Sequence, residues 1–191
     1  FQGVEMEPAD PMTARLTVHY ARERVAEMIL EAEFDYVWWL DDDMVFPPDT
    51  LTRLLKHQKQ VVCALAYQRA EPYNTCVFEW KEETHLPGRY EYLNGIEFGG
   101  LRKVDGCGSA CVLTETSVFK KLLKKRPWFD NKKFGEDLHF CKLCNEASIP
   151  IYCDTDLVIG HLGGRLVVDY DVVARYRHAK AERDALLACV R

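Results

Sequence analysis

Apolar residues follow two different spacings along the chain, and the two alternate. In residues 13–32 they recur every three or four positions, which predicts an amphipathic helix. Residues 36–40 (YVWWL) and 61–67 (VVCALAY) are apolar at every position, which is typical of strands covered on both faces. A short helical stretch, residues 51–58, separates them. Because helices and strands alternate, the pattern predicts an α/β fold with a mixed, mostly parallel sheet flanked by helices.

The second half of the chain predicts shorter elements. Residues 71–103 contain β-prone pieces interrupted by proline and glycine, which is typical of an irregular hairpin excursion. The further elements that we expect are a strand at 107–114, helices at 116–125 and 134–147, short strands at 151–153 and 157–159, and a helix at 171–189. We therefore divide the chain into an N-terminal remnant (1–12) that looks like the scar of a cleaved tag, one domain (13–169) and a C-terminal helix (170–191).

Composition argues against several classes of protein. A net charge of −5 disfavours nucleic acid as a partner, because binding phosphates requires a basic surface. Hydrophobic residues make up 48% of the chain, which suffices for a packed core. No apolar run approaches the roughly 18 residues of a membrane span, and no signal peptide opens the sequence. Nothing in the sequence indicates an oligomeric state.

Eight cysteines raise the question of a metal site. The pairs Cys107/Cys111 and Cys141/Cys144 have spacings seen in zinc proteins. Against zinc, Cys141 and Cys144 lie in EDLHFCKLCNEA, which reads as a continuous helix rather than a tight turn. We expect reduced and mostly buried thiols, and hence a cytoplasmic protein.

Three carboxylates follow the first apolar strand directly. Asp41, Asp42 and Asp43 come after YVWWL, at the strand end beyond which open α/β sheets bind ligands. Side-chain alternation would point Asp41 and Asp43 the same way and Asp42 the other. Paired carboxylates suit magnesium or manganese, which bind one or two carboxylates together with substrate phosphates. An inert, solvated acidic loop is the alternative reading, and the buried strand before it makes the metal site the better one.

Two further places carry candidate chemistry. Glu136 and Asp137 lie at the start of a predicted helix, where acidic residues also serve simply to complement the helix dipole. His161 lies next to glycines just past a strand, where the backbone can approach a ligand closely and the imidazole can bind a metal.

Three segments, in order, resemble glycosyltransferases of the GT-A fold, closest to the family 2 type found in bacteriophages, large viruses and bacteria. They are WWLDDDMVFPPDTL, VDGCGSACVLTETSVFKKL and PWFDNKKFGEDLHFCKLCNEASIPIYCDTDLVIGHLGG. The resemblance extends over roughly residues 13 to 165. It implies a metal-dependent enzyme that moves a sugar from a UDP- or GDP-sugar to the hydroxyl of a glycan or another acceptor, with manganese or magnesium as its cofactor.

The resemblance also implies roles for individual residues on the donor side. Asp43 would bind the metal directly, with Asp41 near the metal or the ribose and Asp42 beside them in the donor site. His161 would be a further metal ligand.

Basic residues complete the implied donor site, and two acids form the acceptor site. Arg22, in the stretch HYARER, matches an arginine near the nucleotide, although Glu23 stands where relatives carry asparagine. Arg69 occupies a position that is often basic. Asp137 would be the catalytic base of an inverting reaction, and Glu136 would position the acceptor or the loop. The positive end of the helix would lower the pKa of Asp137, and a desolvated acceptor site would offset that effect.

One departure from the family concerns the start of the chain. A GT-A domain opens with a strand that contacts the nucleotide base, and residues 1–12 contain no such pattern, so we expect that strand to be missing or to lie upstream. The alternatives to glycosyl transfer are a nucleotidyltransferase acting on a sugar phosphate, and a non-catalytic relative that binds sugar or nucleotide. Inversion is preferred over retention because the acid pair supplies a base.

Overall fold

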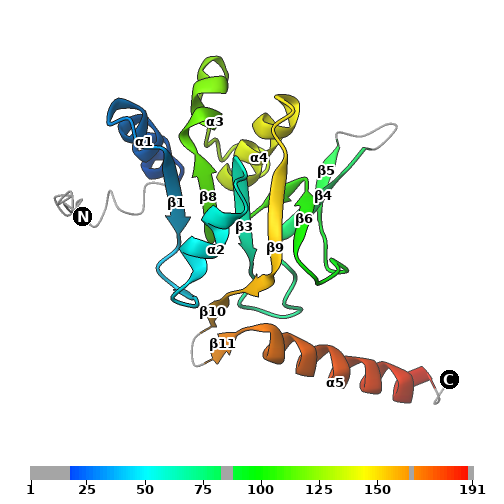
Figure 1. The fold of residues 1–191 in the computed structure, drawn as a ribbon. Coiled ribbons are helices and arrows are strands. Elements are labelled where there is room, and N and C mark those ends of the chain that lie inside the picture. Colours follow the sequence, from blue (N-terminus) through cyan, green and yellow to red (C-terminus); the bar gives the residue numbers. More distant parts are fainter. Residues whose placement is uncertain (1–17, 83–87, 164–165, 189–191) are drawn as a thin grey trace, which may run out of the picture.

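A five-stranded mixed sheet forms the centre of the protein, with helices on both faces (Figure 1). The structure is a computed structural model and describes residues 18–82, 88–163 and 166–188. The strands, in their order across the sheet, are β1 (Tyr36–Leu40), β8 (Cys111–Glu115), β3 (Val61–Leu65), β9 (Ile151–Val158) and β6 (Leu101–Val104). The predicted α/β class and the two apolar strands are thereby confirmed.

The prediction of a mostly parallel sheet is wrong. Only β3 and β9 pair in parallel, while β1/β8, β8/β3 and β9/β6 are antiparallel. The reason is the position of β8, which enters between β1 and β3 and runs opposite to both. The two predicted strands therefore share a direction without being neighbours, and their carboxyl ends still lie at the same edge of the sheet.

Two small sheets extend the central one. The first joins the segment after β1 to the C-terminal region, and the second contains the excursion predicted for residues 71–103, which is an antiparallel hairpin. The first small sheet consists of β2 (Met44–Val45), β10 (Gly160–Gly163) and β11 (Leu166–Val168). The second consists of β4 (Val77–Lys81), β5 (Arg89–Tyr92) and β7 (Gly106–Cys107).

The helices separate into two groups according to the face they cover. The helical elements are α1 (Val18–Glu31), α2 (Thr50–Lys56), α3 (Thr116–Lys121), the 3-10 helix η1 (Leu123–Lys125), α4 (Glu136–Glu146) and α5 (Tyr170–Ala188). Alternate residues of β3 face opposite sides: Val61 and Cys63 pack with α1, α3 and α4, whereas Val62 packs with Leu54 of α2. This two-sided burial explains why the strand is apolar at every position.

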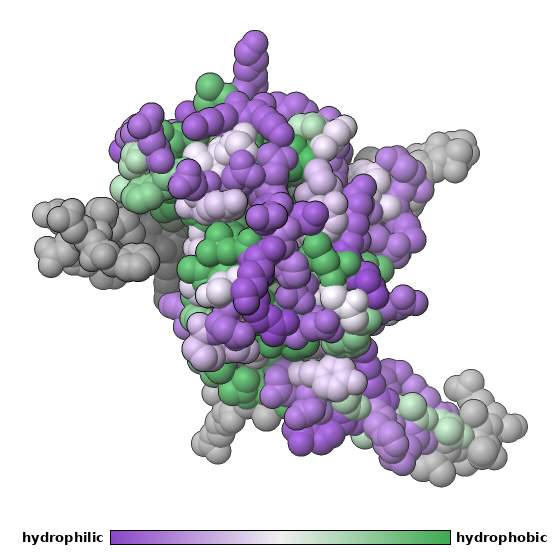
Figure 2. All heavy atoms as spheres, in the orientation of Figure 1, coloured by the Kyte–Doolittle hydropathy of each residue, from purple (hydrophilic) through white to green (hydrophobic). Residues whose placement is uncertain are grey.

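The C-terminal helix α5 runs beneath the sheets in the view of Figure 1, and its C-terminal end projects past the body of the protein. Residues 177–185 of this helix are exposed, and its visible surface is mostly hydrophilic (Figure 2). Near its start, Val172 and Val173 are buried and anchor it to the domain. None of the described helices has the length and apolar character needed to cross a membrane. Residues 1–17, which include the proposed N-terminal remnant and the start of the predicted first helix, lie outside the described part of the chain.

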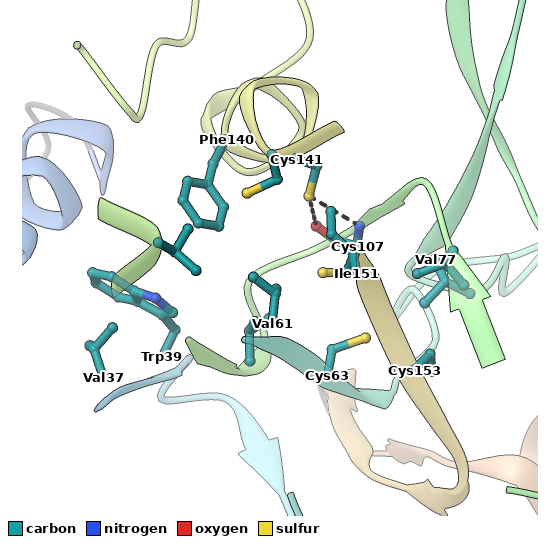
Figure 3. Close-up of a cluster of buried hydrophobic side chains, with 14 of the residues drawn as sticks. Val37, Trp39, Val61, Cys63, Val77, Cys107, Phe140, Cys141, Ile151 and Cys153 are labelled. Atoms are coloured by element: carbon teal, nitrogen blue, oxygen red, sulfur yellow. Dashed lines mark hydrogen bonds between the residues drawn. The ribbon is translucent and has the colours of Figure 1, made fainter. Parts of the chain in front are cut away.

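Buried thiols are concentrated in the larger part of the core. Cys63, Cys107, Cys141, Cys144 and Cys153 belong to one hydrophobic cluster, in which the Cys107 amide donates to Cys141 Sγ at 3.4 Å (Figure 3). The hydrogen bond with the Cys107 side chain raises the pKa of Cys141 most, and burial raises it further, well above its ordinary value. Burial does the same for the pKa of Cys144. The predicted burial of these cysteines is confirmed, and they act as small apolar side chains.

Candidate active site

The acidic turn lies at the carboxyl end of β1, at the edge where β3 and β9 also end (Figure 1). The amide of Asp41 donates to the carbonyl of Ala110 at 3.1 Å, and the carbonyl of Asp43 accepts from the amide of Leu162 at 2.9 Å. Both ends of the turn are therefore fixed by backbone hydrogen bonds. The sheet therefore fixes the position of the turn and of its side chains. Such turns, at the carboxyl ends of strands, are where open α/β sheets bind ligands.

A buried arginine joins the two acidic segments that the sequence singled out. Arg22 Nη2 donates to Asp41 Oδ1 at 3.0 Å, and Nη1 donates to Glu136 Oε1 at 2.7 Å. The Arg22 side chain is 11% exposed and that of Glu136 is 22% exposed, whereas that of Asp41 is 44% exposed, so the bond to Glu136 is the better shielded of these two charge-assisted bonds. The partners come from three separate elements: α1, the turn after β1, and the start of α4. The acidic turn and the acid pair thus belong to one site.

A second group forms around the carboxylate of Asp43. His161 Nε2 lies 3.1 Å from Asp43 Oδ2, and Arg69 Nη1 donates to the same oxygen at 3.0 Å. The other ring nitrogen of His161 lies 2.9 Å from the carbonyl oxygen of Tyr67. A carbonyl only accepts, so Nδ1 carries the proton, and in the neutral imidazole the lone pair of Nε2 faces the carboxylate. Two acceptors that face each other in this way are stabilised by a shared cation or by a second proton on the ring.

The residues predicted to bind metal divide between these two groups. Asp43 and His161 come together, whereas Asp41 is engaged by Arg22. Asp42 is exposed. Within the described ranges, no cluster of three or more His, Cys, Asp and Glu side chains has the geometry of a metal site. A metal at this position would therefore have two protein ligands, Asp43 and His161, with its other ligands supplied from outside the protein.

The acid pair at the start of α4 consists of two differently placed carboxylates. Glu136 is held by Arg22, while Asp137 lies beside Gly108, where a Cβ atom would be 3.5 Å from Asp137 Oδ2. Burial raises the pKa of the Asp137 carboxyl, and the negative charge of Glu136 raises it further. The amide of Leu138 and the charge of Arg22 act in the opposite direction and do not cancel the rise. Desolvation therefore outweighs the lowering by the helix dipole that the sequence suggests.

One residue of the site was not identified from the sequence. The half-buried Cys76 lies next to Gly108, and its Cβ would be 3.6 Å from a Cβ at that glycine. Burial raises the pKa of the Cys76 thiol to about 12, with further contributions from the charges of Asp137 and Asp41. The thiol is therefore protonated and unreactive, and it lies next to Gly108, close to Asp137. Nothing in its local sequence distinguishes it from the other cysteines.

Comparisons with known proteins identify the family and a structure of similar fold. The family described as glycosyl transferase family 2 matches residues 22–124, which is more than half of the chain. The solved structure titled "Crystal Structure of A197 from STIV" is similar in fold, with a TM-score of 0.55, 23% sequence identity, and coverage of 81% of this chain and 73% of that chain. No curated protein matches the sequence. The matched range begins at Arg22 and contains the acidic turn and Arg69, and it shows that the chain belongs to glycosyl transferase family 2.

Proposed function

We propose that the protein is a metal-dependent glycosyltransferase that moves a sugar from a nucleotide-sugar to an acceptor hydroxyl with inversion at the anomeric carbon. The observation that carries this proposal is the Arg22 bridge between Asp41 and Glu136. It brings a carboxylate of the proposed donor side and one of the proposed acceptor side to a single guanidinium. A transferase that joins two substrates needs such a convergence, because both must be held in one geometry.

The pair formed by Asp43 and His161 fits a divalent cation. The lone pair of His161 Nε2 faces a carboxylate oxygen, and the Nδ1 proton is directed to the Tyr67 carbonyl. Histidines that bind metals usually donate their other ring N–H to a carbonyl or carboxylate in this manner. Manganese or magnesium, bound here with the diphosphate of a UDP- or GDP-sugar, would stabilise the charge of the leaving group.

Arg69 supports the same assignment, because it donates to the same oxygen of Asp43 that His161 approaches. Its guanidinium lies 3.0 Å from the carboxylate and its side chain is 62% exposed, so it can turn toward a phosphate without breaking a buried contact. Guanidinium groups bind phosphate oxygens through two parallel hydrogen bonds. We assign Arg69 to holding the donor diphosphate.

Asp137 is the proposed base. The acceptor oxygen attacks the anomeric carbon as the bond from that carbon to the diphosphate oxygen breaks, and the hydroxyl proton passes to Asp137. A carboxyl whose pKa is raised by burial holds such a proton more strongly than an exposed one does. Glu136 is neutralised by Arg22 and positions the loop. Attack opposite to the leaving group, assisted by an enzymic base, gives inversion.

The test measures nucleoside diphosphate released from a panel of UDP- and GDP-sugars, with and without manganese. We expect release with one donor that requires the metal and is lost in Asp43→Asn. The matched control is Asp49→Asn, because Asp49 is exposed and its side chain makes no capping hydrogen bond to α2. Formation of pyrophosphate from a nucleoside triphosphate and a sugar phosphate would identify a nucleotidyltransferase instead. Nucleotide binding without turnover of any donor would identify a non-catalytic relative.

A further inference from the structure

The hairpin formed by β4 and β5 has one aromatic face and one charged face. The register pairs Phe78 with Tyr92 and Trp80 with Tyr90, so these four rings lie on the same side. The residues that alternate with them along the two strands are charged: Glu79, Lys81, Arg89 and Glu91. The ring centroids of Trp80 and Tyr90 are 5.0 Å apart, and those of Phe78 and Tyr92 are 5.1 Å apart. Of these rings, Trp80 and Tyr90 lie beside α4, because both line one cavity together with residues of that helix.

A cavity of about 450 Å³ separates part of this aromatic face from the second half of α4. Trp80 and Tyr90 form its aromatic wall, Lys103 and Asp105 come from the end of β6 and the residue after it, and Lys142 and Asn145 come from α4. Sites for small molecules have volumes of roughly 300–1,000 Å³ and combine apolar walls with a few polar groups. The size and the lining of this cavity both fall within that description.

The polar groups of the cavity are held in place, and some of their hydrogen-bonding capacity is free. Asp105 Oδ2 accepts from the amide of Trp80 at 2.9 Å, and Asn145 Nδ2 donates to the Asp105 carbonyl at 2.6 Å. The Lys142 ammonium lies 4.6 Å from the Trp80 ring centroid. Among the residues that the structure describes, Asp105 Oδ1 accepts no hydrogen bond and Lys103 has no partner. A ligand with hydroxyl groups can therefore bond to a carboxylate oxygen and an ammonium beside an aromatic wall.

The charge of the lining favours a neutral ligand. Two lysines are opposed by three acids, because Glu82 and Glu146 line the cavity together with Asp105. Lys142 is also within 3.3 Å of Glu146, which reduces its availability to an anion. A phosphate or a sulfated ligand would meet more negative than positive charge. Hydroxyl groups, which both donate and accept, match this mixture better.

The cavity is connected to the candidate active site through an aromatic residue and a helix. The ring of Phe134, two residues before Glu136, has its centroid 5.7 Å from both Trp80 and Tyr90. Asp137 and Asn145 lie on the same helix and are separated by about 12 Å at 1.5 Å per residue. A short oligosaccharide spans such a distance.

The geometry points to a binding subsite for a neutral saccharide unit of the acceptor, distal to the hydroxyl that reacts. The assignment to the acceptor rests on the proposed function. The binding of a neutral saccharide by the cavity does not, because it can be measured without donor, metal or turnover.

The experiment screens the full chain against an array of neutral and acidic oligosaccharides and then titrates the best neutral tetrasaccharide by calorimetry, without nucleotide or metal. We expect Trp80→Leu to weaken binding at least tenfold and Asp105→Asn to weaken it several-fold. Asp105→Asn is the variant that is safe for folding, because its amide oxygen still accepts from the Trp80 backbone. Glu79→Gln, on the charged face of the same hairpin, is the matched control and should bind like the unmodified protein.

Three outcomes would overturn the inference: no binding of any neutral saccharide, selective binding of acidic saccharides, or unchanged affinity in both Trp80→Leu and Asp105→Asn. Asp43→Asn separates this inference from the proposed function, since it should abolish donor turnover and leave saccharide binding intact. Saccharide binding without transferase activity would remove the proposed function alone. Transfer to a monosaccharide acceptor without saccharide binding in the cavity would remove the subsite alone.

Discussion

Replacing Arg22 with methionine tests the connection between the two acidic segments. Methionine retains the length and the apolar stem of the side chain but removes both hydrogen bonds, to Asp41 at 3.0 Å and to Glu136 at 2.7 Å. It also leaves two carboxylates without their shared cation. Of these, Glu136 is 22% exposed and Asp41 is 44% exposed, so water can compensate Asp41 more fully than Glu136.

The expected loss of stability follows from that difference in exposure. Removing one partner of a fully buried ion pair costs about 3–5 kcal/mol, whereas an exposed pair contributes about 0–1 kcal/mol. Because Glu136 is largely buried and Asp41 is not, we expect Arg22→Met to lower the free energy of unfolding by about 2–4 kcal/mol. For a domain of this size each kcal/mol corresponds to about 2–4 °C, so the melting temperature should fall by about 4–16 °C.

Urea denaturation and thermal melting measure this effect, with Arg24→Met as the matched control. Arg24 lies on the same helix, pairs with Glu27 at 3.0 Å and has a side chain that is 63% exposed, so its loss should cost less than about 1 kcal/mol. A double-mutant cycle with Glu136→Gln should give a coupling free energy of about 1–3 kcal/mol. If Arg22→Met melts within 2 °C of the Arg24→Met variant, or if the cycle gives no coupling (within about 0.3 kcal/mol), Arg22 does not join the two segments in solution.

Four further predictions concern the chemistry of the site. Asp137→Asn should reduce turnover by about 10²–10⁴-fold while donor binding is unchanged, and Glu136→Gln should act more mildly; equal turnover in both variants would contradict the assignment of the base. The pKa of Asp137 is raised in the folded protein, so protonation of this carboxyl favours the folded state, and that stability is lost as the pH rises through the raised pKa. Asparagine is uncharged at every pH, so Asp137→Asn should stabilise the protein more at neutral than at acidic pH. Thermal melts of both proteins across pH would show this difference. Asp43→Asn and His161→Ala should each weaken manganese and nucleotide binding together in calorimetry, and an unchanged nucleotide affinity would exclude a bridging metal. Because burial raises the pKa of Cys76 to about 12, iodoacetamide should modify this thiol in the folded protein at pH 8 much more slowly than after unfolding, and rapid labelling of the folded protein would contradict its burial.

The sequence by itself determined the elements and the residue types of the site. Runs such as YVWWL and VVCALAY predict buried strands because only a strand with both faces covered tolerates apolar side chains at every position. The acidic turn could be located because it follows such a strand directly, and strand ends of open α/β sheets are where ligands bind. These inferences need only neighbouring residues, and the structure contains both strands and the turn between β1 and β2.

The tertiary structure alone decided which residues meet and which proton affinities result. Local periodicity reports how a segment is buried but not its partner, so it could not place β8 between β1 and β3 and suggested a parallel sheet instead. The contacts of Arg22 join residues 19 and 114 positions away, and His161 meets Asp43 across 118 positions. The pKa of Asp137 depends on the water excluded around it, which the packing of α4 against β7 determines. A helix-start aspartate looks like a dipole cap in the sequence, and only its desolvation in the folded protein raises its pKa as a base requires.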